Sequence, residues 1–434
     1  MSNILNKDQG LQSGAILPAA RDLRSTWVLA LGTFAVGTDA FIVSAFLPQM
    51  AHELSVPSSV AGHSVTAFAL AYALLAPVIA TLTAAMERRR LLVGSLVLLG
   101  ISNIASALSW SMEVLVITRV AAAAFAAAYT PNAGAVAAAL AGPQARARAL
   151  AVVIGGLTVA TALGVPIGHV VSAAMSWRAS LALVGVVSFV SAIAVFSLMP
   201  RLAGGTKVTL RRRLAALRRP RVLAILPLTI VGMAACYTPY AFTLEVLGAL
   251  RVPASALTFM LFAYGIGAFV GNYLSGQGTD RAGPFAILAS TYALMSVSLG
   301  ALAWFGRTPS AQALVPVAFL MVCWGASSWA QSPAQQHRLI VSAPDEAPLA
   351  VALNSSCIYL GMSIGTATGG QLIEQGATVV LACGAGLAGL ALAYLLITAS
   401  HLPATRRHRT HGALRAPATR PRNDPAAHDP SQGP

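Results

Sequence analysis

Two charged side chains of opposite sign lie deep in apolar stretches in the first half of the sequence. Asp39 stands in the run from Trp27 to Gln49, and Arg119 stands in the stretch LVITRVAAAAF. An ionisable group at bilayer depth costs roughly 2.5 to 3.5 kcal/mol, so it needs a partner or an aqueous cavity. At 1.5 Å per residue, the two lie roughly 18 and 20 Å from the same membrane surface. We therefore expect Asp39 and Arg119 to form an ion pair between the first and fourth apolar runs.

Such a pair has chemistry suited to proton coupling. Desolvation favours the neutral form of a carboxyl group, whereas a nearby guanidinium favours the ionised form. A small rearrangement that changes either influence loads or releases a proton, and the membrane potential supplies about 2.3 kcal/mol per charge per 100 mV. The alternative is a static pair that fixes helix registry. We favour coupling, and we regard Glu245, near the outer end of the seventh run, as a weaker candidate for the same role.

The elements that must position these groups are membrane-spanning helices. Of the 434 residues, 56% are hydrophobic and 9% are charged, and the mean hydropathy is +0.72. A helix of about 20 apolar residues crosses a hydrocarbon core roughly 30 Å thick. The sequence predicts an all-α polytopic membrane protein with about twelve spans, over residues 27–49, 58–83, 91–110, 113–139, 149–173, 179–199, 222–247, 255–277, 284–305, 312–335, 349–372 and 377–399.

The basic residues indicate the orientation of these spans. The net charge is +15, and 24 of the 28 Lys and Arg residues fall on one side of the membrane if the first span runs outward. This asymmetry follows the positive-inside rule, so we expect a multi-pass protein of the cell (inner or plasma) membrane with both termini in the cytoplasm. Topology explains the basic charge, and we expect no nucleic-acid partner. Residues 1–26 have no signal-peptide pattern and are expected to be a cytoplasmic N-terminal segment.

A basic segment divides the spans into two sets of six. Residues 200–221 carry eight Lys and Arg residues, which predicts a cytoplasmic linker. It is either an amphipathic helix on the anionic leaflet or a segment whose charge only sets topology. We expect an N-terminal six-helix bundle over 27–199, a C-terminal six-helix bundle over 222–399, and a disordered cytoplasmic tail over 400–434.

The two sets of spans contain related sequences. A shift of 196 residues brings Phe46 onto Phe242 and the dipeptide Val56-Pro57 onto Val252-Pro253. Internal repeats of this kind are typical of secondary transporters. We therefore expect the two bundles to be related by internal pseudo-symmetry around a central cavity.

Small residues recur every four positions in both halves, which places them on one helix face and lets another backbone approach closely. Symmetric helix contacts are favoured over ordinary tight packing because the pattern occurs twice. The two series are Gly156, Ala160, Gly164 and Gly168 in the fifth span and Cys357, Gly361, Gly365 and Gly369 in the eleventh.

Several stretches carry a family resemblance. Residues 37–56 read GTDAFIVSAFLPQMAHELSV, residues 160–169 read ATALGVPIGH, and residues 352–370 read ALNSSCIYLGMSIGTATGG. Over roughly 27–399 the chain resembles the major facilitator superfamily, and within it the twelve-span drug:proton antiporters, closest to the arabinose, chloramphenicol and purine efflux group. The resemblance implies efflux by antiport, multidrug or antibiotic resistance, and a packing role for the glycines above together with Pro166.

The resemblance also implies a charge-based gate on the cytoplasmic side. The loop after the eighth span has Gly276, Asp280-Arg281 and Gly283, close to the family pattern. The loop after the second span keeps only its basic end, Arg88-Arg89-Arg90. We therefore expect the gate to depend mainly on Asp280 and Arg281.

Polar and aromatic residues within the spans are candidates for lining the cavity, although each is equally explained as a satisfied helix contact. They are Asn354, Asn132, Tyr129, Tyr237, Tyr240 and Trp324. The sequence has no catalytic carboxylate pair, Ser/His/Asp set, phosphate-binding loop or metal cluster. We therefore expect neither an enzyme nor a bound cofactor or metal.

Together these features predict a secondary active transporter that works by alternating access. We expect proton-coupled export of a small organic compound, a drug or a metabolite, by a monomer whose other partners are protons and the lipid bilayer. Fold does not fix direction, so a proton-coupled importer of sugar or nutrient is an alternative. A membrane receptor or scaffold without transport is the second alternative.

Overall fold

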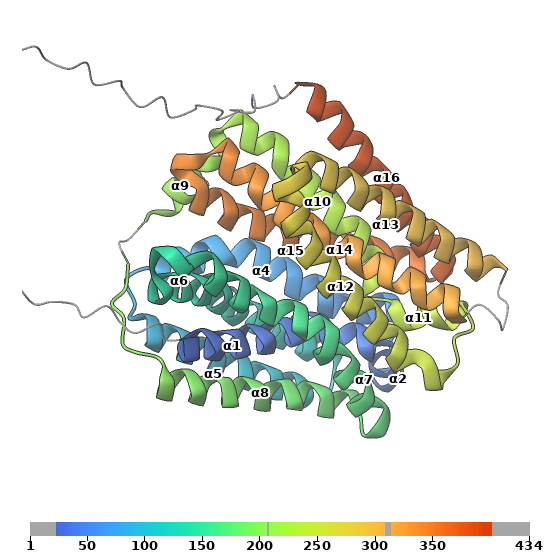
Figure 1. The fold of residues 1–434 in the computed structure, drawn as a ribbon. Coiled ribbons are helices and arrows are strands. Elements are labelled where there is room, and N and C mark those ends of the chain that lie inside the picture. The colour runs from blue at the N-terminus through green and yellow to red at the C-terminus, as the bar shows by residue number, and fades with distance from the viewer. Residues whose placement is uncertain (1–22, 206–207, 309–313, 402–434) are drawn as a thin grey trace, which may run out of the picture.

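A computed structural model describes residues 23–205, 208–308 and 314–401, so the N-terminal segment and the C-terminal tail lie almost wholly outside the described residues. Within these ranges all regular elements are helices (Figure 1). Twelve are long and apolar enough to cross a membrane, as predicted. They are Ser25–Ala45, Ser58–Leu82, Arg88–Ala107, Met112–Gly142, Arg148–Ala174, Trp177–Leu198, Pro220–Tyr240, Ala254–Ala282, Pro284–Arg307, Leu314–Ser342, Leu349–Ile373 and Ala377–Thr398.

The helices before the linker pack against one another and form the first bundle (Figure 1, blue to green). This bundle contains α1 (Leu23–Phe41), η1 (Ile42–Ala45), α2 (Leu47–Glu53), α3 (Ser58–Ala61), α4 (His63–Leu82), α5 (Arg88–Ala107), α6 (Met112–Val159), η2 (Ala160–Gly164), α7 (Val165–Ala174) and α8 (Trp177–Leu198). The fourth span and the first part of the fifth belong to α6, which is kinked at Gly142. That residue has φ 71°, a left-handed conformation that glycine adopts without steric cost.

The helices after the linker form the second bundle (Figure 1, yellow-green to red). This bundle contains α10 (Pro220–Tyr240), α11 (Thr243–Ala249), α12 (Ala254–Ala282), α13 (Pro284–Arg307), α14 (Leu314–Ser342), η4 (Pro344–Glu346), α15 (Ala347–Ile373) and α16 (Ala377–His401). We call the end at which residues 199–219 join the bundles the linker end, and the opposite end the far end.

The internal repeat extends to the backbone. Ser55 and Arg251, which are 196 positions apart, are the two non-glycine residues with positive φ among the described residues, at 54° and 55°. The next residue in each half donates a backbone hydrogen bond of 3.0 Å to the carbonyl five positions earlier, Val56 to Ala51 and Val252 to Leu247. The same turn therefore joins the first two spans of each bundle.

Two predicted spans extend past breaks in their helices. The first span was expected to reach residue 49, but α1 ends at Phe41 and passes through the 3-10 helix η1 into α2. The seventh was expected to reach residue 247, but α10 ends at Tyr240 and α11 follows as a separate short helix. The apolar composition continues through both breaks, so hydropathy does not register them. Glu245 consequently lies on α11, beyond the seventh span.

The linker is bound to both bundles. The backbone N–H of Arg88 donates to the Leu202 carbonyl at 2.9 Å, and that of Gly205 donates to Ala84 at 2.9 Å. Arg219 forms an ion pair of 2.9 Å with Glu346 in the second bundle. The described part of the linker contains the short helices α9 (Leu210–Arg213) and η3 (Leu214–Arg218), and a place for them on the anionic leaflet stays a prediction.

The bundles touch mainly through five elements, with α4 against α15 and α12 against η2 and α7. Figure 1 shows the bundles converging near α2 and α11 and lying farther apart toward α9. At the far end, the Ser59 hydroxyl donates to the Glu374 carboxylate across the seam at 2.6 Å. The described contacts between the bundles therefore gather in the half of the molecule remote from the linker.

Candidate functional site: a buried ion pair beneath an aromatic cover

Asp39 and Arg119 form the ion pair that the sequence predicts. One guanidinium nitrogen, Nη1, contacts the Asp39 carboxylate oxygen Oδ1, and the other, Nη2, donates to the Asp39 backbone carbonyl at 2.8 Å. Because α1 ends at Phe41, that carbonyl belongs to the last turn, whose carbonyls lack helical donors. Arg119 thus neutralises the Asp39 carboxylate and also caps the C-terminal end of α1. Asp39 is 0% exposed and Arg119 1%.

Two other polar atoms of the ion pair have no hydrogen-bond partner in the part of the chain that the structure describes. Asp39 Oδ2 and Arg119 Nε are buried and have no hydrogen-bond partner among the described residues. The Phe68 ring from α4 lies over the guanidinium, 4.5 Å from Cζ to the ring centroid. An aromatic face attracts a cation but accepts no conventional hydrogen bond from Nε. One carboxylate oxygen of Asp39 is therefore unpaired within the described part of the chain.

Three of the predicted cavity residues lie together in an aromatic cluster of the second bundle. Tyr237 and Tyr240 on α10 are 5.2 Å apart between ring centroids. Tyr240 is 6.4 Å from Trp324 on α14, and Tyr264 lies 5.1 Å from Tyr240 and 5.0 Å from Trp324. All four rings are buried. They form one apolar surface with polar edges, the composition typical of small-molecule sites.

This cluster meets the first bundle at Phe41, two residues after Asp39. The Phe41 ring lies 6.3 Å from Tyr237, 6.4 Å from Tyr240 and 5.8 Å from Trp329. Sequence reasoning missed Phe41, Trp329 and Tyr264, because an aromatic residue within a span has no pattern that separates interface from core. The structure therefore places the predicted aromatic residues against the helix that carries Asp39.

Tyr129 and Asn132 make contacts within the first bundle. The Tyr129 hydroxyl donates to the Leu29 carbonyl at 3.1 Å, and its ring occupies the space beside Gly32. The Asn132 side-chain oxygen accepts from Arg88 at 2.8 Å, and its amide donates to Ala128 at 2.8 Å. These contacts match the alternative of a satisfied helix contact, and a role in binding substrate stays a prediction.

Asn354 ends a buried chain of polar groups in the second bundle. Arg338 donates to Gln335 at 3.0 Å, Gln335 donates to Thr229 at 3.0 Å, and Thr229 donates to the Asn354 side-chain oxygen at 2.8 Å. Asn354 is 0% exposed, and its Nδ2 has no hydrogen-bond partner among the described residues. A buried unpaired donor is costly, so Nδ2 is a candidate for contacting a polar substrate group, as are the Tyr240 hydroxyl and Trp324 Nε1, which also lack partners among the described residues.

The predicted gate residues differ in their contacts. Arg89 donates to the Phe196 carbonyl at 3.3 Å, Arg90 pairs with Glu87 at 3.0 Å, and Arg88 contacts Asn132 as described above. Asp280 and Arg281 are exposed, and neither has an ion pair among the described residues. The described contacts of the first-half copy lie within its own bundle, and the dependence of the gate on Asp280 and Arg281 stays a prediction.

Two glycines of the gate motif have different local roles. Gly283 has φ 84° between α12 and α13, where a side chain would be strained. Gly276 has open space where a Cβ would lie. The backbone therefore requires glycine at position 283 and not at 276.

The glycine stripes make equivalent contacts in the two bundles. A Cβ on Gly156 would lie 2.4 Å from the Ala30 carbonyl, and Gly164 and Gly168 are pressed as closely on Thr38 and Ile42 of the first span. The eleventh span packs on the seventh in the same way, through Gly361, Gly365 and Gly369. A Cβ added to any of the three would lie 2.2 to 2.5 Å from a carbonyl oxygen of the seventh span. The fifth span thus packs on the first as the eleventh packs on the seventh.

Pro166 accounts for a local change of helix type in the fifth span. A proline has no N–H to donate, so a regular α-helical hydrogen bond is lost there. The preceding residues, Ala160–Gly164, form the π-helical turn η2. Ala162 of this turn lies against Gly265 of the other bundle, where a built Cβ would be 2.3 Å from its Cα. The kinked part of the fifth span is therefore a point of contact between bundles.

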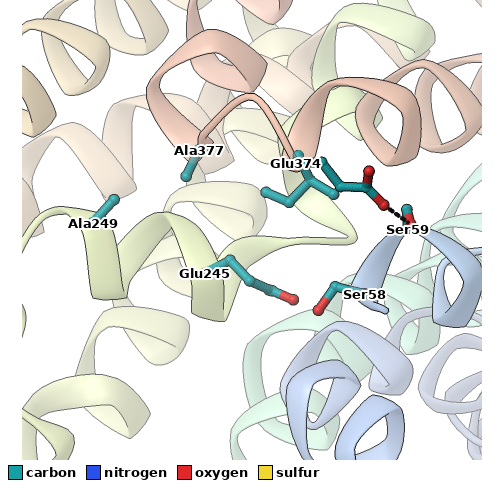
Figure 2. A pocket seen from close by; sticks show the side chains of 7 residues that line it. Ser58, Ser59, Glu245, Ala249, Glu374 and Ala377 are labelled. Atoms are coloured by element: carbon teal, nitrogen blue, oxygen red, sulfur yellow. Dashed lines mark hydrogen bonds between the residues drawn. The ribbon is translucent and has the colours of Figure 1, made fainter. Parts of the chain in front are cut away.

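A polar pocket lies at the far end of the seam (Figure 2). It has a volume of about 340 Å³ and is lined by Ser58 and Ser59 from α3 and by Glu245, Ala249, Ile373, Glu374 and Ala377 from the second bundle. Glu245 and Ser58 point toward each other in Figure 2, and both Glu245 carboxylate oxygens are buried without a hydrogen-bond partner among the described residues. Burial raises the pKa of Glu245 above its ordinary value.

Comparison with known proteins identifies the family. The model of the Major Facilitator Superfamily matches residues 29–366. The inner membrane transport protein YdhP of Escherichia coli is 29% identical over 87% of this chain and 96% of its own length. A probable sugar efflux transporter of Mannheimia succiniciproducens is 28% identical over 80% of this chain and 86% of its own.

The fold agrees with this match. The solved structure of a D-xylose-proton symporter superposes with a TM-score of 0.72 at 15% identity, over 87% of this chain and 97% of that one. Proteins of this kind are membrane transporters and not enzymes. The chain is a multi-pass membrane protein that belongs to the major facilitator superfamily.

Proposed function

We propose that the chain exports a small organic compound from the cytoplasm in exchange for protons, with the Asp39–Arg119 pair as the coupling site. The observation that carries this proposal is the buried pair with one free carboxylate oxygen. A carboxylate held by one guanidinium nitrogen stays ionised, and loss of that contact in a low-dielectric site favours uptake of a proton. Protonation and movement of the fourth span relative to the first are thereby linked.

Alternating access supplies the rest of the mechanism. The bundles rock so that the site faces one side of the membrane at a time, and the proposed orientation places the linker end in the cytoplasm. The conformation described here, with its inter-bundle contacts gathered at the far end, is then the state closed to the outside. In this scheme a proton bound from outside stays on Asp39 until the cytoplasmic side opens.

The aromatic cluster and Asn354 support a partly apolar cargo that also accepts hydrogen bonds. Ring faces contribute apolar area and the unpaired Asn354 Nδ2 contributes a donor. Sugars, nucleosides and many antibiotics have this character, and one relative is named as a probable sugar efflux transporter. A panel of these compounds, tested for accumulation in cells with and without the protein, identifies the cargo to be used below.

Direction and coupling are tested together in inside-out membrane vesicles. A proton gradient that is acid inside should drive cargo accumulation in vesicles containing the protein, and an uncoupler should abolish it. Accumulation driven only by the opposite gradient would establish import by symport. Binding of cargo with no uptake under either gradient would favour the receptor alternative.

A further inference from the structure

A tyrosine of the second bundle packs on α4 beside Phe68, the ring that lies over Arg119. Tyr359 on α15 stacks on Tyr72 of α4, with ring centroids 3.6 Å apart and an interplanar angle of 19°. It also lies 6.5 Å from Phe68, the ring that covers the Arg119 guanidinium. Phe68 and Tyr72 are four residues apart and therefore lie on one face of α4. Tyr359 thus rests on both rings from the opposite side of the bundle interface.

Tyr359 is buried at this contact, with 8% of its surface exposed. The second bundle also contacts the first at Phe41 of α1, through Tyr237, Tyr240 and Trp329. Phe41 follows Asp39 by two residues, which is about 200° around a helix, so the residues that cover Phe41 face away from the carboxylate.

We propose that Tyr359 is a positioning residue for proton coupling, a cover from the second bundle that closes the path of water from the far end to the Asp39–Arg119 pair. It makes the environment of Asp39 depend on the position of the other bundle. When α15 leaves α4, the ring leaves Phe68 and Tyr72, and water reaches Asp39. When the bundles close, the pair is again desolvated.

This inference deepens the proposed function, but its test reads the accessibility of Asp39 and not transport. Purified protein is treated with a water-soluble carbodiimide and an amine, and modification of the peptide containing Asp39 is followed by mass spectrometry. Asp39→Asn gives the blank. Tyr359→Ala should raise the modification rate several-fold, whereas Tyr359→Phe, which keeps the ring, should remain near the wild-type rate.

Trp329→Ala is the matched control. It removes a ring of the second bundle that lies against Phe41, 5.8 Å away between centroids, and leaves Tyr359 on α4. The proposal requires this variant to modify at the wild-type rate. An unchanged rate in Tyr359→Ala, or an equal rise in Trp329→Ala, would overturn it, because the second result would indicate general loosening of the interface.

The two proposals fail separately. If Tyr359→Ala is poorly folded, Tyr359→Val replaces it, because valine keeps more of the side chain. This variant should also raise the modification rate of Asp39 several-fold. An unchanged modification rate removes Tyr359 from the account and leaves proton coupling at Asp39 in place. Full uphill transport by Asp39→Asn would remove the coupling role whatever the modification rates are.

Discussion

At the scale of single residues, the contact between Asp39 and Arg119 uses properties that only arginine combines. The planar guanidinium reaches the carboxylate with one nitrogen and the backbone carbonyl with another, and it presents its face to Phe68. Lysine has a single donor centre and no planar face. Both charges are fully buried, so removing either one leaves the other uncompensated.

A double variant separates proton coupling from a static registry role. Arg119→Gln alone should lower the free energy of unfolding by about 3–5 kcal/mol, because it leaves the Asp39 charge buried and unpaired. Adding Asp39→Asn removes that charge and should recover much of the loss, measured as Tm in detergent. We expect the double variant to regain stability and still lack uphill transport. Recovery of uphill transport together with stability would show that the pair only fixes registry.

At the scale of elements, close helix approach depends on individual glycines. Gly156 touches the first span, whereas its neighbour Gly155 has open space where a Cβ would lie. The fifth span also changes from α to π geometry before Pro166 and contacts the other bundle there. One span therefore joins rigid packing within its bundle to a contact that must change when the bundles rock.

The two adjacent glycines provide a matched pair of substitutions. Gly156→Ala forces a methyl group to within 2.4 Å of the Ala30 carbonyl, and overpacking of this kind costs roughly 1–3 kcal/mol. Gly155→Ala meets no atom and should be neutral or slightly stabilising. Thermal unfolding of both variants in the same detergent compares them. Equal Tm values would show that the α1 and α6 contact is looser than described.

Glu245 on α11 gives a pH-dependent prediction. Its pKa is raised by burial, so the folded protein binds this proton more tightly than the unfolded chain. Its contribution to stability is therefore greatest at low pH and is lost as the pH rises through the folded-state pKa. Glu245→Gln is neutral at every pH and should raise Tm at about pH 7.5 but change it little at about pH 4.

Glu374→Gln is the control for that effect. Glu374 lines the same pocket but is exposed and accepts a hydrogen bond from Ser59. This variant should show no gain in Tm that grows with pH. A lower Tm for Glu245→Gln at both pH values would contradict the assignment of Glu245 as a destabilising buried carboxylate.

At the scale of the whole molecule, the features that recur along the chain could be predicted from the sequence. Apolar length gives the twelve spans, and the 196-residue repeat anticipates matching turns at Ser55 and Arg251. The Asp39–Arg119 pair followed from depth alone, since few charges lie far from water. Each of these features leaves a pattern in the composition of the chain or in the spacing of its residues.

Features that depend on the relative position of the two bundles could not be predicted. Tyr359 is an ordinary aromatic residue in an apolar span, and only the fold brings it onto Tyr72. The break after Phe41 is made by backbone geometry within an apolar run, and Arg88 reaches Asn132 through the packing of separate spans. Such contacts join distant segments and have no local sequence pattern.

In the proposed mechanism, Asp39 carries the proton that is exchanged for cargo. The most direct test reconstitutes wild-type protein and Asp39→Asn in proteoliposomes with a pH-sensitive dye inside, and adds a cargo gradient without an imposed pH gradient. The account predicts that cargo movement drives opposite proton movement in the wild type. In Asp39→Asn, cargo should exchange down its gradient with no proton flux. Cargo-driven proton flux of wild-type size in Asp39→Asn would contradict the account.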